Sequence, residues 1–173
     1  MKIEYHAIDT AGELYERFNK RNDVVDYILG EDCEHVKSVG EVAVSNNSLK
    51  IRIGILSSRD TLPKIIQNGG VAFVGFDCEV DIISLVEPIN RYRASSTFFD
   101  FIMLENEDVL SIFEIDVFCF DKYGKIRWKY GASDIITDYK VSNGLLNLSF
   151  LDSNNKIISV ISGVESQNAI GDG

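Results

Sequence analysis

The strict alternation of side chains along residues 125–130 constrains the fold more than any other feature of the sequence. Apolar side chains fall on one face of an extended chain and basic ones on the other: Ile126, Trp128 and Tyr130 against Lys125, Arg127 and Lys129. Successive side chains of a β-strand point to opposite faces, so a period of two residues indicates a strand that is buried on one face only. We therefore expect a strand here, with Trp128 turned into the core.

Further strands are expected along the rest of the chain, because comparable runs are separated by turn signals about every 8 to 15 residues in the second half. In the second half of the chain these runs predict a meander of about five strands. Besides the strand over residues 125–130, we expect strands over residues 97–104, 109–121, 145–151 and 156–161. The first half predicts a strand over 2–8, a hairpin over 41–56 around Ser45-Asn46-Asn47-Ser48, and an extended run over 71–85.

One helix is predicted near the start of the chain, over residues 11–29. Thr10 followed by Glu13 matches a capping box, and Gly30 is a suitable terminator. Apolar residues recur between them at roughly helical spacing: Leu14, Phe18, Val25 and Ile28. The pattern is weakest near Asn22-Asp23, where a break in the helix is compatible with the sequence.

Together these elements predict an α+β fold, in which one N-terminal helix accompanies a mostly antiparallel, curved sheet or two packed sheets. No linker and no internal repeat divides the chain. We therefore expect a single globular domain over residues 1–163 and a flexible C-terminal tail over residues 164–173, where the strand pattern is lost.

The segment Val117-Phe118-Cys119-Phe120-Asp121-Lys122-Tyr123-Gly124-Lys125-Ile126-Arg127-Trp128-Lys129-Tyr130 resembles one blade motif of a quinoprotein-type β-propeller. Such a blade has a strand, an Asp-x-x-Gly-Lys turn and a Trp on the next strand, and Gly124 permits the positive φ of that turn. The resemblance spans about 40 residues, 111–151, and the motif occurs once, whereas a propeller needs at least four blades, so length excludes a closed propeller. The arrangement is also similar to that of small uncharacterised bacterial proteins, some associated with toxin and immunity loci, and it implies no catalytic residues.

The charge of the chain indicates its class of partner. Seventeen Lys and Arg against 27 Asp and Glu give a formal net charge of −10, which repels nucleic acids and anionic membranes. The sequence has neither a membrane-spanning apolar stretch nor the apolar core of a signal peptide, so we expect a cytoplasmic protein. The three scattered cysteines, Cys33, Cys78 and Cys119, predict reduced thiols. A basic protein is the expected partner, unless the acidity serves solubility alone, and the oligomeric state stays open.

Two groups of carboxylates are the candidate partner-binding residues. Asp77, Glu79 and Asp81 occupy every second position of an extended run, so we expect them in one row, about 6.6 to 6.8 Å apart, on the outer face of a strand. Glu105, Glu107 and Asp108 lie in an acidic turn. Such carboxylates are either solvated or receive Lys and Arg from a partner.

No catalytic, metal or cofactor site is legible in the sequence. The densest metal-competent cluster, Glu31-Asp32-Cys33-Glu34-His35, offers too few ligands for zinc, and the only other histidine is His6. No Gly-rich phosphate loop precedes a helix. We therefore predict no cofactor and a binding function, that of an acidic cytoplasmic protein that caps a basic partner, for example an immunity protein that neutralises a bacterial toxin. Two alternatives are a carbohydrate- or small-ligand-binding β module with a deep aromatic pocket, and an enzyme with a site of dispersed carboxylates.

Overall fold

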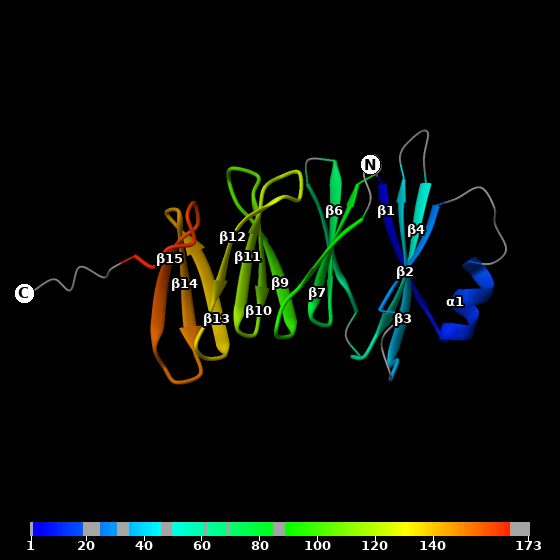
Figure 1. Cartoon of the computed structure of the whole chain (residues 1–173), viewed down its shortest axis with the longest axis horizontal. Helices are drawn as coiled ribbons and strands as arrows, with labels where there is room; N and C mark the ends of the chain where they lie inside the picture. Colours follow the sequence, from blue (N-terminus) through cyan, green and yellow to red (C-terminus); the bar gives the residue numbers. More distant parts are fainter. Residues whose placement is uncertain are drawn as a thin grey trace, which may run out of the picture. The chain divides into compact units, whose positions relative to one another are not determined.

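A computed structural model describes residues 2–18, 25–30, 35–45, 50–60, 62–68, 70–84 and 89–166. The chain divides into two compact units, Met1–Tyr92 and Arg93–Gly173. The strands form four sheets, two in each unit (Figure 1), and the described residues contain one short helix. The predicted α+β class is therefore wrong, because most described residues are in strands and these belong to four sheets rather than to one curved sheet or two packed ones.

Sheet A of the first unit contains, in spatial order, β1 (Lys2–Ile8), β3 (Ser38–Ser45), β4 (Lys50–Ser57) and β2 (Val25–Leu29). β3 pairs with β1 and with β4 in antiparallel register, whereas β2 runs parallel to β4. The pairing of β3 with β4 confirms the hairpin predicted over 41–56, and its turn, residues 46–49, lies outside the described residues.

The helix predicted over residues 11–29 is shorter than expected. α1 (Ala11–Phe18) begins after Thr10, whose Oγ1 accepts a hydrogen bond from the Glu13 backbone N–H at 3.1 Å, as a capping residue does. Residues 19–24 lie outside the described part, and residues 25–29 form β2 instead of a helix. The physical reason is that β4 offers a row of backbone donors and acceptors, and a segment with β-branched and aromatic residues satisfies them as a strand.

Sheet B of the first unit is a meander in the order β5 (Lys64–Asn68), β6 (Val71–Phe76), β7 (Glu79–Ser84) and β8 (Asn90–Arg93). The extended run predicted over 71–85 is thus a hairpin, and Asp77, with φ at 44°, lies in its turn with Cys78. Apolar side chains of sheets A and B form a common core, to which Val42, Ile53, Val74 and Ile83 contribute. The other face of sheet A carries α1, whose Leu14 and Phe18 are buried with Leu56.

The second unit contains two antiparallel sheets. Sheet C has the order β12 (Ile126–Gly131), β11 (Asp116–Phe120), β10 (Val109–Phe113) and β9 (Phe98–Met103), and sheet D has the order β13 (Ile136–Ser142), β14 (Leu145–Phe150) and β15 (Asn155–Ser159). Buried side chains of both sheets form one core, among them Leu110, Val117, Leu148 and Ile158. The predicted strands of the second half are present, but the described part of the second unit has seven strands in two sheets rather than one meander of about five. The run over 109–121 is the pair β10 and β11, and β13 was not predicted.

The alternation along residues 125–130 has the predicted facing. Ile126, Trp128 and Tyr130 are half-buried, whereas Arg127 and Lys129 are exposed. In the turn before β12, Asp121 Oδ1 accepts hydrogen bonds from the backbone N–H groups of Tyr123 and Lys125, at 2.9 Å each, and Gly124 has a φ of 83°.

Beyond β15 the chain stays attached to sheet D for a few residues. Glu165 forms a β-bridge with Ile158, and residues 167–173, where most of the expected tail falls, lie outside the described residues. The single domain expected over 1–163 stays a prediction. In the described part of the chain, no helix has the length and hydropathy needed to cross a membrane.

Candidate functional site

Asp77, the first candidate carboxylate, is saturated by donors of its own unit. Its Oδ1 accepts a hydrogen bond from Ser57 Oγ at 2.6 Å. Its Oδ2 accepts two more, from the backbone N–H of Ser58 at 2.9 Å and from Ser58 Oγ at 3.2 Å. These bonds tie the β6–β7 turn to the end of β4, which gives Asp77 a structural role.

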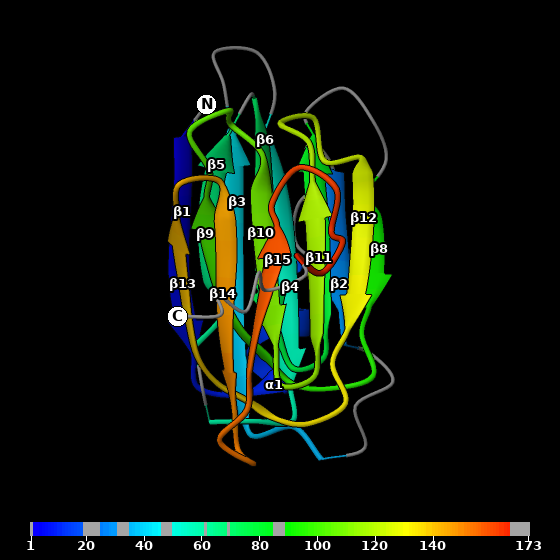
Figure 2. The ribbon, with the colours of Figure 1, turned by 90° about the vertical axis from the view of Figure 1, so that its left-hand side faces the viewer.

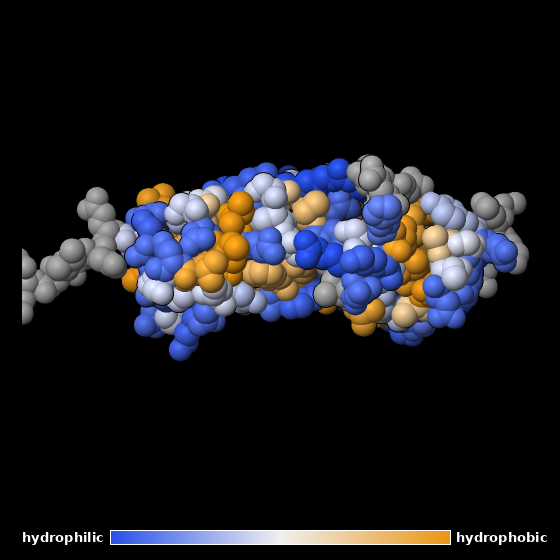
Figure 3. Space-filling model, turned by 90° about the horizontal axis from the view of Figure 1, so that it is seen from below, coloured by the Kyte–Doolittle hydropathy of each residue, from blue (hydrophilic) through white to orange (hydrophobic). Residues whose placement is uncertain are grey.

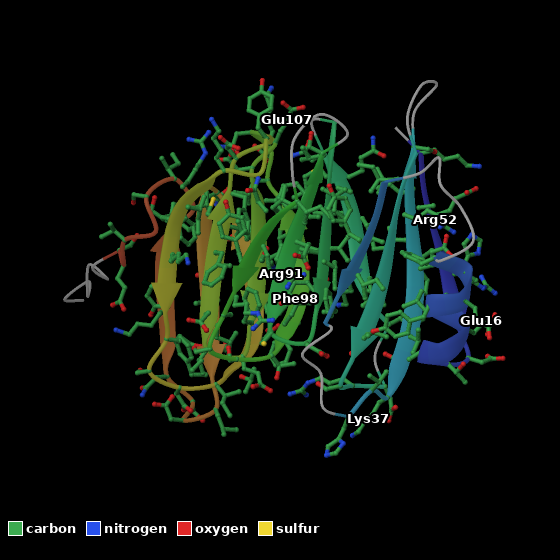
Figure 4. All side chains as sticks on the ribbon, turned by 45° about the vertical axis from the view of Figure 1, so that its right-hand side comes forward. Glu16, Lys37, Arg52, Arg91, Phe98 and Glu107 are labelled. Carbon is green, nitrogen blue, oxygen red and sulfur yellow. The ribbon has the colours of Figure 1, made fainter. Side chains whose placement is uncertain are left out.

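Glu79 and Asp81 lie inside the first unit. Their residues are 3% and 0% exposed, and the register of β7 with β6 places them opposite Phe76 and Val74, two core residues. Arg91 of β8 (Figure 4) reaches both, with its Nε 3.2 Å from Asp81 Oδ1 and 3.8 Å from Glu79 Oε2. The row that we expected on an outer face is therefore not formed, and both carboxylates are inaccessible from solvent.

The three carboxylates of the acidic turn between β9 and β10 have three different environments. Glu107, at the tip of this turn (Figure 4), pairs with Lys122 Nζ at 2.9 Å. Asp108 is buried, and its Oδ2 lies 2.9 Å from Arg127 Nε and 2.8 Å from Asn106 Nδ2. Glu105 is exposed, and no hydrogen bond or ion pair joins its carboxylate to another described residue. Of the six candidates, Glu105 is thus the one whose charge is left available.

Glu105 belongs to the wall of an open groove of about 480 Å³ in the second unit. The groove lies between the ends of sheets C and D and is lined by residues 102–106, 141–144 and 160–161. Its walls are mainly aliphatic, and two of its lining residues, Met103 and Ile161, are 51% and 78% exposed. None of the lining residues is aromatic.

Exposed apolar side chains also occur elsewhere in the described chain. The face seen in Figure 3 is mostly hydrophilic and is interrupted by separate apolar patches. The exposed large apolar residues of the described chain are Tyr15, Val36, Leu62, Met103, Tyr123, Ile135, Leu151, Ile161 and Val164. The groove combines two of them with a concave surface, which makes it the best candidate site.

Three turns give the groove its shape. Leu104 N–H donates to the Asp108 carbonyl at 2.8 Å, which closes the β9–β10 turn. Asn143 and Gly144, with φ values of 51° and 73°, form the two-residue β13–β14 turn, in which both residues need a positive φ. Val160 N–H donates to the Gly144 carbonyl at 3.1 Å and thereby places Val160 and Ile161 against that turn.

Residues 160–165, which we call the closing segment, are held by side chains of β12 and β15. Trp128 Nε1 donates to the Val160 carbonyl at 3.0 Å. Glu165 accepts hydrogen bonds from Tyr130 Oη at 3.1 Å and from Lys156 Nζ at 2.7 Å, and these two donors hold its pKa below the usual value. Because the segment begins with two groove residues, these contacts also position the groove.

Two tyrosines of the second unit have a strongly raised pKa. Burial and the hydrogen bond to Glu165 raise the pKa of Tyr130 to about 12. Burial, followed by the charge of Asp100 and the hydrogen bond to Asp100 Oδ2 at 3.1 Å, raises the pKa of Tyr139 to about 12. The Tyr139 bond joins β13 to β9 and thus one sheet to the other.

These shifts predict a loss of stability at alkaline pH. A pKa raised above 10.0, the ordinary value for a tyrosine, means that folding favours the neutral phenol. The stabilisation from these phenols is therefore complete below pH 10 and is lost as pH rises towards 12. We expect the urea midpoint of the protein to fall over this range, and to fall less in the double variant Tyr130→Phe/Tyr139→Phe. Tyr123→Phe, at an exposed position, is the matched control. An equal alkaline slope in the wild type and the double variant would contradict the prediction.

Metal-competent and thiol groups do not assemble into a second site in the described part of the chain. No group of three or more His, Cys, Asp and Glu there could hold a metal ion. Residues 31–34 of the predicted cluster lie outside the described residues, and His35 is exposed. Burial and the charge of Asp108 raise the pKa of Cys119 to about 12, so this thiol stays protonated at neutral pH, whereas Cys78 is exposed.

The groove was missed by sequence reasoning, although one of its walls has a local signal. Asn143-Gly144 is the dipeptide most typical of a two-residue hairpin turn, and it marks the end of β13. Met103 and Ile161 carry no comparable signal, because an apolar residue at a strand end resembles any core residue. Their exposure follows from where two sheets end, and this is a property of the tertiary structure.

Comparison with known proteins adds little. No family model and no curated protein matches the sequence. One of the solved structures that do match is described as "AfRom2 CNH domain", with 12% identity and a TM-score of 0.44, over 77% of this chain and 47% of that chain. This chain thus spans about half the length of that structure. A likeness of this size carries no argument about fold or function.

Proposed function

We propose that this chain is a binding protein that captures a basic protein partner at the groove beside Glu105. The observation that carries the proposal is the combination of an open aliphatic groove with a carboxylate that no other described residue engages. Apolar side chains of a partner would cover Met103 and Ile161. A Lys or Arg next to them would reach Glu105, so the groove selects both for shape and for charge.

The net charge of −10 supports a basic partner. A field of this sign raises the rate of encounter with a positively charged surface, and it weakens when salt screens exposed charges over about 8 Å at physiological ionic strength. An immunity protein that neutralises a basic bacterial toxin is the specific form of this proposal. The cytoplasm is the compartment that we propose for it, because its cysteines would stay reduced there.

The two alternative functions have less support in the described residues. A small-ligand module favours a deep pocket with aromatic walls, whereas this groove is open and has none. An enzyme with dispersed carboxylates needs them to be accessible. Glu79, Asp81 and Asp108 are buried, and Asp77 and Glu107 are engaged by serines and a lysine.

The test uses a pair of charge reversals. Glu105→Lys removes the free carboxylate of the groove, and Asp60→Lys makes the same change at an exposed residue of the first unit. Both substitutions are at the surface, so we expect each to alter the free energy of unfolding by no more than about 0.5 kcal/mol. Wild type and both variants serve as bait for proteins of the source cell, with far-UV circular dichroism to confirm folding.

We expect a basic partner that is retained by the wild type and by Asp60→Lys and lost by Glu105→Lys. Its association rate with the wild type should fall steeply as salt is added, because the attraction acts between exposed charges. A partner that binds all three baits with equal rate and affinity would remove the groove from the interface and contradict the proposal.

A further inference from the structure

We infer that the partner enters the groove as an extended strand that pairs with the free edge of β13. This inference rests on the proposed function and adds the form in which the partner is recognised. β13 is the first strand of sheet D, and in the described residues it has a neighbour, β14, on one side only. Figure 2 shows β13 along one edge of this sheet.

The other edge of sheet D is already covered by the chain itself. Ser159 N–H donates to the Val164 carbonyl at 3.0 Å, and Ser166 N–H donates to the Ile157 carbonyl at 2.8 Å. With the bridge between Ile158 and Glu165, these bonds place the end of the described chain beside β15. β13 is therefore the edge of sheet D that remains open to a strand from outside.

The turn after β13 determines which backbone groups face outward. A two-residue turn joins Ser142 to Leu145 as a hydrogen-bonded pair. Hydrogen-bonded pairs alternate along an antiparallel ladder, so Tyr139 and Val141 direct their N–H and C=O groups away from β14. Tyr139 N–H is engaged by Asp138 Oδ1 at 2.9 Å, whereas Val141 offers both of its groups.

Val141 also lines the groove, so its position determines which side chains a paired strand must have. A strand paired at Val141 places every second side chain on the face of sheet D that lines the groove, beside Met103 and Ile161. Those that lie against Met103 and Ile161 must be aliphatic. Glu105 lies on the same wall as Met103, so a Lys or Arg of the strand can reach a carboxylate that is otherwise unengaged. The structure thus fits an extended segment in which every second side chain faces the groove, and these side chains are aliphatic except for one Lys or Arg that meets Glu105.

The experiment uses fluorescence anisotropy and a defined probe, the peptide Thr-Val-Thr-Val-Thr-Lys-Thr-amide with fluorescein on its N-terminal amine. Its two Val and its Lys lie on one face of an extended strand. One control peptide is N-methylated at alternate residues, which removes backbone donors and keeps the side chains, and a second has Glu in place of Lys. The full chain is used as wild type, Val141→Pro, which removes the outward N–H, and Val141→Thr, which keeps it. Proline is tolerated at a strand edge where its N–H faces solvent, and the N-methylated peptide tests the same bond with the wild-type protein.

We expect the wild type to bind the probe, and Val141→Thr, which keeps the N–H, to bind it more tightly than Val141→Pro. N-methylation, Val141→Pro and the Lys-to-Glu exchange should each weaken binding at least about tenfold, which corresponds to roughly 1.4 kcal/mol. The second control separates recognition of charge from recognition of the backbone.

Three results would overturn the inference. Equal binding of the N-methylated peptide would exclude strand pairing and leave the proposed groove function in place. A second such result combines two observations: none of the peptides binds, while the bait experiment still finds a partner that depends on Glu105. The groove would then recognise a partner that is not an extended strand. Self-association of the wild type that Val141→Pro abolishes would show that a second copy of the chain occupies this edge.

Discussion

Arg91→Ala is expected to destabilise the first unit by about 3 to 5 kcal/mol, because it removes the guanidinium that faces two buried carboxylates. The residues of Glu79 and Asp81 are 3% and 0% exposed, so solvent screens their charges little, although the Arg91 side chain is itself 38% exposed. The free energy of unfolding is measured by urea titration with far-UV circular dichroism. A change below about 0.5 kcal/mol, the usual size for a surface substitution, would contradict this expectation.

A second substitution separates the lost charge from lost packing. Asp81→Asn is nearly the same size and neutral, so the double variant Arg91→Ala/Asp81→Asn should be more stable than Arg91→Ala. If the double variant is no more stable, the loss comes from the packing of the Arg91 side chain.

The same variant also tests whether the two units unfold together. The chain has one tryptophan, Trp128, and it lies in the second unit, so its fluorescence reports on that unit. Equal shifts of the fluorescence and circular dichroism transitions in Arg91→Ala would support the single domain predicted over residues 1–163.

Trp128→Ala is expected to destabilise the second unit by about 3 kcal/mol, the lower end of the range for buried aromatic truncations, because Trp128 is half-buried. The indole packs so closely on Gly163 that a Cβ there would lie 2.6 Å from the ring. It also donates to the Val160 carbonyl, and no other side chain among the described residues does so. Truncation should therefore release the closing segment and weaken binding at the groove.

Trp128→Phe is the matched control for this substitution. It keeps an aromatic ring against Gly163 but removes the N–H donor, so it should cost about 1 kcal/mol, as expected for one hydrogen bond. Neither variant retains a tryptophan, so unfolding is followed by circular dichroism. If Trp128→Ala costs no more than Trp128→Phe, the contact with Gly163 contributes nothing, and our description of the closing segment is wrong.

Local patterns determined several elements of this protein. The facing of Trp128 in β12, the turn from Asp121 to Lys125, the hairpin of β3 and β4, and the capping of α1 by Thr10 all agree with the sequence analysis. Each of them depends on residues that are close in sequence, where the positive φ of a glycine, the donor of a cap or the period of a strand acts directly.

The positions of the charged residues followed from tertiary contacts. Glu79 and Asp81 alternate with apolar residues as if one face of β7 met solvent, yet residues 79–83 are buried on both faces. Polar residues then no longer mark the surface, and Arg91, ten residues after Asp81, places its guanidinium beside both carboxylates. The wrong helix prediction for β2 has a similar cause. The apolar residues of this segment are compatible with a helix or a strand, and hydrogen bonding to the edge of β4 stabilises the strand.

The fold class and the groove depended on contacts between distant segments. The pattern of a single strand does not predict how many sheets the strands will form. The pairing of strands depends on burial and on backbone hydrogen bonding over the whole chain. The groove combines residues 102–106, 141–144 and 160–161, which no local pattern connects. The β-rich, acidic character of the chain, its turns and its strand faces could be read from the sequence, because these depend on near neighbours. The burial of Glu79 and Asp81 follows from packing on both faces of β7, and the exposure of Glu105 beside an apolar groove follows from where sheets C and D end, so neither could be read from a local pattern.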